Sequence, residues 1–161
     1  MIIILMGVSG SGKTTIGQML AKQLGWSFYD GDDFHPRANI EKMAHDIPLT
    51  DEDRAAWLAA LAQLIGGLEK DQRPGIIACS ALKQSYRQRL QPQGADVRFV
   101  YLKGSYELIL QRMQARHGHY MKPEMLKSQF ATLQEPQGVP AVDIGQTPEA
   151  IVKQIRQALG I

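Results

Sequence analysis

The sequence is short of cysteine, of net charge and of long apolar runs. Cys79 is the single cysteine among 161 residues, so no disulfide can form within the chain, which suits a reducing compartment. The formal net charge is only +2, which is too mild to favour nucleic acid as the main partner. No apolar run approaches the ~20 residues of a membrane helix, and the opening MIIILM lacks the basic leader of a signal peptide. We therefore expect a cytoplasmic protein without a membrane partner.

Internal repeats and low-complexity tracts are missing as well. Hydrophobic residues make up 44% of the chain and charged residues 21%, which is the balance of a globular protein. A chain of this length is the size of one ordinary domain and can bury a real core. We therefore expect residues 1–161 to form a single domain.

The chain alternates between strand patterns and helical patterns. Short apolar runs predict strands at residues 2–6, 26–30, 75–80, 97–102 and 141–144. Amphipathic spacing predicts helices at residues 16–24, 49–70, 105–113, 125–133 and 147–159. This order predicts an α/β fold with a doubly wound, parallel five-stranded sheet. Ligands bind such sheets beyond the carboxyl ends of the strands.

Several residues mark where the predicted helices begin and end. Gly25 stands where a C-terminal cap is preferred. Thr50 and Asp53 have the spacing of a capping box. Ser105 and Thr147 are candidate N-terminal caps for the two later helices.

The first predicted strand runs into GVSGSGKTT, which fits the phosphate-binding pattern G-x-x-x-x-G-K-[ST]. Its glycines let backbone N–H groups turn toward phosphate oxygens, and the following helix adds its positive end. We expect Lys13 to reach the β- and γ-phosphates and Thr14 to ligate Mg²⁺. The position between a strand and a helix argues against a chance match in a flexible loop. The predicted ATP-binding loop comprises Gly7, Val8, Ser9, Gly10, Ser11, Gly12, Lys13, Thr14 and Thr15.

A phosphate-binding loop alone does not fix the function. The sequence contains neither the N-K-x-D nor the D-x-x-G pattern of GTPase switches. The third predicted strand ends without the carboxylate that a motor or transporter ATPase needs, whereas the second ends in Asp30. A small protein with this arrangement resembles the nucleoside-monophosphate and shikimate kinase group.

That resemblance assigns roles to the acids of DGDDFH, residues 30–35. It implies that Asp30 faces Mg²⁺ through its water shell. It also implies that Asp32 accepts the proton of the substrate hydroxyl as this hydroxyl attacks the γ-phosphate. The alternative is a solvated turn, where Asp and Gly are common.

Further segments are similar to successive signature blocks of gluconokinases, which phosphorylate the 6-hydroxyl of D-gluconate. The blocks occur in the family's order and extend the resemblance from the phosphate-binding loop to about Pro136. They read DGDDFHPRANIEKM, PLTDEDR, CSALKQSYRQRL, RMQARHGHYM and SQFATLQEP.

This resemblance implies gluconate as the small-molecule partner. Asp32 and His35 would meet its hydroxyls, although His35 could instead orient its loop. Lys83 and Arg87 lie four positions apart, which puts them on one helical face for the substrate carboxylate. The alternative for these two cations is an exposed helix face. The family also implies a homodimer.

Residues 112–124 are predicted to form a mobile lid, because phosphoryl transfer to a hydroxyl competes with transfer to water. By similarity to nucleotide kinases, Arg112 would lie against adenine and Arg116 on the transferring phosphoryl group. His119 could touch substrate or phosphate. The alternative is a surface loop with solvated arginines.

We therefore predict an ATP- and Mg²⁺-dependent gluconokinase with Lys13, Asp32 and Arg116 as its catalytic residues. The main alternative is a kinase of shikimate or of another small hydroxy acid. A second alternative is a nucleotide-binding module without catalysis.

Overall fold

Five parallel strands form the centre of the molecule, as the sequence predicts. The computed structural model describes residues 1–116 and 122–161. The strands lie in the order β2-β3-β1-β4-β5, and every neighbouring pair is parallel. They are β1 (Ile2–Met6), β2 (Ser27–Asp30), β3 (Gly75–Ala78), β4 (Val97–Lys103) and β5 (Ala141–Asp143).

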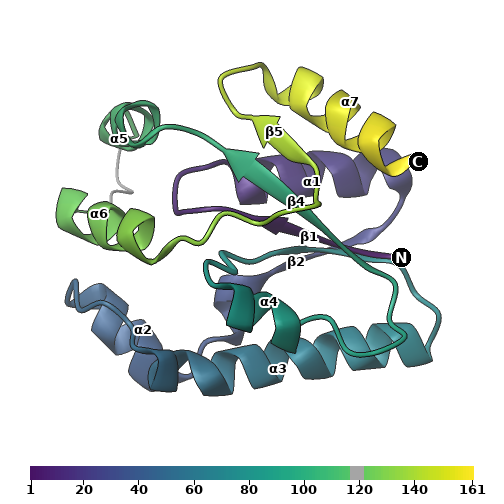
Figure 1. Cartoon of the computed structure of the whole chain (residues 1–161), viewed down its shortest axis with the longest axis horizontal. Helices are drawn as coiled ribbons and strands as arrows, with labels where there is room; N and C mark the ends of the chain where they lie inside the picture. The colour runs from purple at the N-terminus through teal and green to yellow at the C-terminus, as the bar shows by residue number, and fades with distance from the viewer. Residues whose placement is uncertain (117–121) are drawn as a thin grey trace.

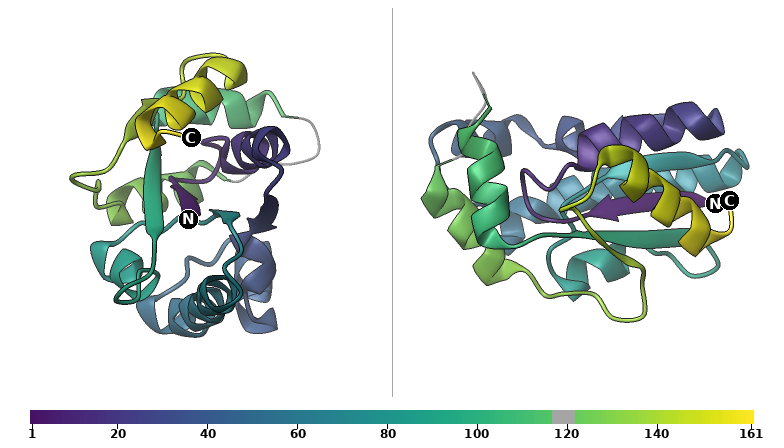
Figure 2. Two further views of the ribbon diagram at one scale, coloured as in Figure 1. Left: turned by 90° about the vertical axis from the view of Figure 1, so that its right-hand side faces the viewer. Right: turned by 90° about the horizontal axis from the view of Figure 1, so that it is seen from above.

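Helices cover both faces of this sheet (Figures 1 and 2). They are α1 (Lys13–Leu24), α2 (Arg37–Ala44), α3 (Asp51–Lys70), α4 (Gln84–Arg89), α5 (Tyr106–Gln114), α6 (Pro123–Thr132) and α7 (Pro148–Leu159). The carboxyl ends of the strands point toward the side of the molecule where α2, α5 and α6 gather (Figure 1). Among the described residues, no helix combines the length and the apolar character needed to cross a membrane.

Strand β1 divides the apolar core into two layers. Its five residues are fully buried, and successive side chains of a strand point to opposite faces of the sheet. Ile3 and Leu5 pack in the layer that contains Ile16 of α1 and Ile155 of α7. Ile2, Ile4 and Met6 pack in the other layer, with the apolar stripe of α3. The continuous apolar run that predicts a doubly covered strand is therefore confirmed.

The predicted helix ends agree with the structure. Gly25 adopts the left-handed conformation at the end of α1. Thr50 and Asp53 form a reciprocal capping box at the start of α3. The hydroxyls of Ser105 and Thr147 accept hydrogen bonds from backbone N–H groups in the first turns of α5 and α7.

Two short elements are not anticipated by the sequence patterns. A 3₁₀ turn spans Gly31–Phe34, where the Asp30 carboxylate caps the Asp32 N–H at 3.0 Å. Helix α2 follows Pro36, and its only fully buried residue is Asn39. An apolar stripe could not reveal this helix, because α2 packs through a polar side chain. Strand β3 ends two residues earlier than predicted, which leaves Cys79 and Ser80 in the loop at its carboxyl end.

Candidate active site

The loop between β1 and α1 has the backbone shape of a phosphate cradle. Gly10 and Gly12 have φ angles of 81° and 96°, a region that side chains with a Cβ rarely enter. The loop delivers the chain directly into α1 at Lys13. The Lys13 ammonium donates hydrogen bonds of 2.9 Å to the carbonyls of both Gly7 and Val8. Burial lowers the pKa of Lys13, and the nearby Asp32 carboxylate opposes that shift.

Three cavities meet around this loop. The α3-side cavity, of about 280 Å³, is lined by residues that include Ser9, Lys13, Asp32, His35, Arg54 and Gln129. The β2-side cavity, of about 510 Å³, is lined by Lys13, Thr14, Asp30 and Asp32 among others. The α7-side cavity, of about 350 Å³, is lined by residues that include Gly12, Thr15, Arg112, Gln146 and Pro148. Arg116 lines all three, and Lys13 and Asp32 line the first two. The structure thus brings together the three residues that the sequence predicts as catalytic.

Gly31 fixes the position of the acids that follow β2. A Cβ added to Gly31 would lie 2.4 Å from the backbone oxygen of Ala78 at the end of β3. The Gly31 carbonyl in turn accepts a 2.7 Å hydrogen bond from the indole N–H of Trp57 on α3. Asp30 and Asp32 therefore flank a backbone contact that leaves no room for movement toward β3.

The Asp32 carboxylate faces water-accessible space rather than the core. Desolvation by surrounding protein atoms raises its pKa, and the Lys13 ammonium works against that shift. Its side chain is 81% exposed, so solvent screens these effects. The carboxylate is consequently accessible to a substrate that enters the cavities.

His35 is held as a neutral imidazole behind Asp32. Its ring stacks on Trp57 with the ring centroids 4.3 Å apart. The Asn39 amide, which also donates to the Asp53 carbonyl at 2.8 Å, lies 3.2 Å from His35 Nδ1. Burial, followed by the charge of Arg54, lowers the pKa of His35 to about 4. Because the Asn39 amide is a donor, Nδ1 accepts and the ring proton sits on Nε2, which is 3.9 Å from an Asp32 oxygen.

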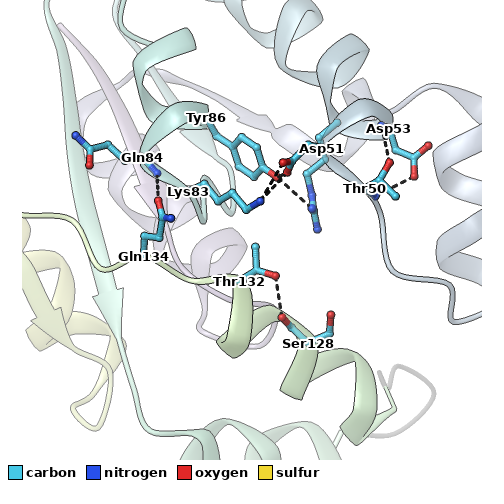
Figure 3. A network of polar contacts seen from close by, with 10 residues as sticks. Thr50, Asp51, Asp53, Lys83, Gln84, Tyr86, Ser128, Thr132 and Gln134 are labelled. Atoms are coloured by element: carbon cyan, nitrogen blue, oxygen red, sulfur yellow. Dashed lines mark hydrogen bonds and ion pairs between the residues drawn. The ribbon is translucent and has the colours of Figure 1, made fainter.

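A polar network joins the start of α3 to α4 (Figure 3). The Lys83 ammonium donates to Asp51 at 2.8 Å, and the Tyr86 hydroxyl donates to the same carboxylate. These hydrogen bonds lower the pKa of Asp51. The Tyr86 hydroxyl also accepts a 3.2 Å hydrogen bond from the Arg54 guanidinium. The network therefore gives the Arg54 guanidinium a hydrogen-bond partner. Arg54 lines the α3-side cavity and was not predicted as a site residue from the sequence.

The structure does not bring Lys83 and Arg87 into the α3-side cavity. Lys83 has extended backbone angles just before α4, so the two side chains do not share a helix face. Arg87 is 8% exposed, and its guanidinium donates to the carbonyls of Ala81 at 2.7 Å and Gln134 at 2.8 Å. Both cations are thus engaged with the protein's own groups, whereas Arg54 at the start of α3 lines the α3-side cavity.

The two predicted lid arginines lie at the end of α5. Arg112 in its last turn donates to the Ile144 carbonyl at 2.7 Å and lines the α7-side cavity. Arg116 follows the helix and borders all three cavities. His119 and the middle of the predicted lid lie outside the described residues.

Comparisons with known proteins match nearly the whole chain. A family model described as shikimate kinase matches residues 9–159. The thermosensitive gluconokinase of Escherichia coli (strain K12) is 48% identical over 160 residues, which cover 97% of this chain and 86% of that protein. The thermoresistant gluconokinase of the same strain is 46% identical and covers 94% and 89%. A crystal structure of a gluconokinase from Sinorhizobium meliloti 1021 has a TM-score of 0.87 at 40% identity, with 98% and 93% covered.

The neutral state of His35 predicts a loss of stability in mild acid. Its pKa falls from 6.5 to about 4 on folding, so the unfolded chain binds more protons between these pH values. The contribution of neutral His35 to the free energy of unfolding is therefore complete above pH 6.5 and is lost as the pH falls toward 4. The free energy changes by at most about 1.4 kcal/mol per pH unit. Urea unfolding across this range should show the advantage of the wild type over His35→Gln shrinking with acidity. Parallel stability curves would show that His35 does not titrate in this way.

Proposed function

The chain belongs to the gluconokinase family, and we propose that it transfers the γ-phosphate of ATP to the 6-hydroxyl of D-gluconate. The observation that carries this proposal is the placement of Lys13, Asp32 and Arg116 on the walls shared by neighbouring cavities. One cavity has the phosphate cradle as a wall, and the other offers polar groups suited to a polyol acid. A transfer reaction needs both ligands to meet at such a wall.

The β2-side cavity suits a triphosphate with its Mg²⁺. Thr14 and Asp30, which line this cavity, would hold Mg²⁺ through the kind of oxygen ligands that this ion prefers. When bound, Mg²⁺ neutralises charge on the phosphates. Lys13 would turn from its loop carbonyls to the β- and γ-phosphates. The α7-side cavity, which is lined by Arg112, Gln146 and Pro148 among others, would receive the adenine.

The α3-side cavity suits gluconate. Arg54 would bind its carboxylate, because a guanidinium pairs with a carboxylate through two parallel hydrogen bonds. Asp32 would accept the 6-hydroxyl proton as the oxygen attacks phosphorus. His35 lines the same cavity, and its Nε2–H would donate to Asp32 or to a substrate hydroxyl. Arg116 would stabilise the charge that builds on the transferring group.

Mg²⁺ dependence, the homodimer and the cytoplasmic location stay predictions: the first from the phosphate-binding motif and the family resemblance, the second from the resemblance alone, and the third from the composition. An assay of ATP turnover distinguishes the two alternatives, a shikimate kinase and a nucleotide-binding module. A kinase specific for shikimate would ignore gluconate, and a nucleotide-binding module would bind ATP without turnover in the presence of either acid.

ADP release with each acid tests the proposed function. We expect purified protein with ATP and Mg²⁺ to release ADP in the presence of D-gluconate, with 6-phosphogluconate as the second product. Shikimate should give at most background release. Turnover with shikimate alone, or ATP binding with no turnover, would contradict the proposal.

The role of Asp32 predicts a selective loss of turnover. Asp32→Asn keeps the size of the side chain but removes its ability to accept a proton, so kcat should fall by about 10²–10⁴-fold. Nucleotide affinity should change little, since phosphate binding relies on the loop. Asp33→Asn is the matched control, because Asp33 lines none of the three cavities. Equal effects of the two substitutions on kcat would remove Asp32 from its role.

The role of Arg54 predicts an effect on gluconate alone. Arg54→Ala should raise the KM for gluconate about 10- to 100-fold, the cost of losing a charged hydrogen-bonded pair, while the KM for ATP stays unchanged. The preference for gluconate over D-glucitol, which lacks the carboxylate, should shrink by a similar factor. Arg98→Ala serves as a control, since Arg98 pairs with Asp96 away from the cavities. An undiminished preference would mean that another cation reads the carboxylate.

A further inference from the structure

Helix α6 places a side chain directly on the phosphate-binding loop. The Oε1 atom of Gln129 accepts a 2.7 Å hydrogen bond from the Ser9 N–H, and its Nε2 atom donates to the Ser9 hydroxyl at 3.0 Å. The two residues are 120 positions apart in the sequence, so this contact ties α6 to the loop between β1 and α1. Both side chains border the α3-side cavity.

The Ser9 N–H belongs to a loop of the type whose backbone N–H groups bind phosphate oxygens. In this structure it points at a carboxamide oxygen of the protein instead. The Lys13 ammonium is satisfied in the same manner, by the carbonyls of Gly7 and Val8. A donor that is left without a partner away from water is costly, so an internal oxygen stabilises the cradle before a phosphate arrives.

Helix α6 also contacts the other wall of the α3-side cavity. Lys122, the residue before the helix, forms a 2.9 Å ion pair with Asp46 after α2. Met125 and Ser128 of α6 line this cavity beside Gln129. A change in the hydrogen bonds between Gln129 and the loop would therefore alter the α3-side cavity, where the acceptor is expected to bind.

We propose that Gln129 is a positioning residue whose carboxamide competes with the triphosphate for the Ser9 N–H. Binding of the triphosphate replaces the carboxamide oxygen with a phosphate oxygen and releases this link between the loop and α6. Nucleotide occupancy is thereby communicated to the cavity for the acceptor. The part of this inference that concerns the acceptor rests on the proposed function.

Calorimetric titration with the non-hydrolysable analogue AMPPNP and Mg²⁺ tests the competition. Gln129→Met keeps the length of the side chain and removes the competing oxygen. We expect it to bind AMPPNP about two- to tenfold more tightly than the wild type, the range that one hydrogen bond allows. Gln129→Glu should bind AMPPNP at least tenfold more weakly, because a charged acceptor holds the N–H more strongly and repels phosphate.

Gln134→Met is the matched control. The Gln134 carboxamide also accepts a backbone hydrogen bond, from the Gln84 N–H at 2.9 Å (Figure 3). Gln134 does not line any of the three cavities. Its AMPPNP affinity should equal that of the wild type. A Gln129→Met protein that binds AMPPNP no more tightly than this control would overturn the competition, because a purely structural contact predicts unchanged or weaker binding.

Gluconate titrations with and without AMPPNP test the communication. In the wild type we expect AMPPNP to change the gluconate affinity by about fivefold or more, and in Gln129→Met this factor should approach one. An equal factor in both proteins would overturn the communication. If gluconate binds neither protein, the proposed function fails, and the AMPPNP titrations still decide the role of Gln129.

Discussion

The close contact between the turn after β2 and the end of β3 is the constraint on which the site depends. No side chain at position 31 would fit against the Ala78 carbonyl, and Trp57 holds the Gly31 carbonyl from the other direction. Asp30 and Asp32 are therefore fixed on either side of one backbone point. The parallel register of β2, β3 and β1 then sets this point beside the phosphate-binding loop. In this way a packing requirement in the sheet determines where the acids stand.

Three donors of the site have partners within the protein before any ligand arrives. Lys13 donates to its own loop, the Ser9 N–H to Gln129, and Arg54 to the Tyr86 hydroxyl. The Asp32 carboxylate, in contrast, is open to solvent on a wall shared by two cavities. Ligand binding would thus exchange internal hydrogen bonds for bonds to phosphate and carboxylate oxygens, which costs less than exposing unpaired donors.

The sequence predicted the sheet, the phosphate-binding loop and the helix ends because each depends on local patterns. The sequence was a poorer guide to the positions of side chains that are set by contacts between distant residues. Lys83 and Arg87 have helical spacing, but Lys83 lies in extended backbone before α4 and Arg87 points at backbone carbonyls. Arg54 carried no signal of its own in the sequence, since only the fold shows that its guanidinium donates to the Tyr86 hydroxyl. Gln129 carried no signal of its own, because its partner is 120 residues away.

The central claim is that the two ligands meet at the Asp32 carboxylate. A crystal structure of the protein with AMPPNP, Mg²⁺ and D-gluconate tests it most directly. The account predicts the 6-hydroxyl of gluconate within about 2.6–3.2 Å of an Asp32 oxygen and in line with the γ-phosphorus. A gluconate molecule bound with its 6-hydroxyl beyond the reach of Asp32, or with its carboxylate toward the γ-phosphate, would contradict it.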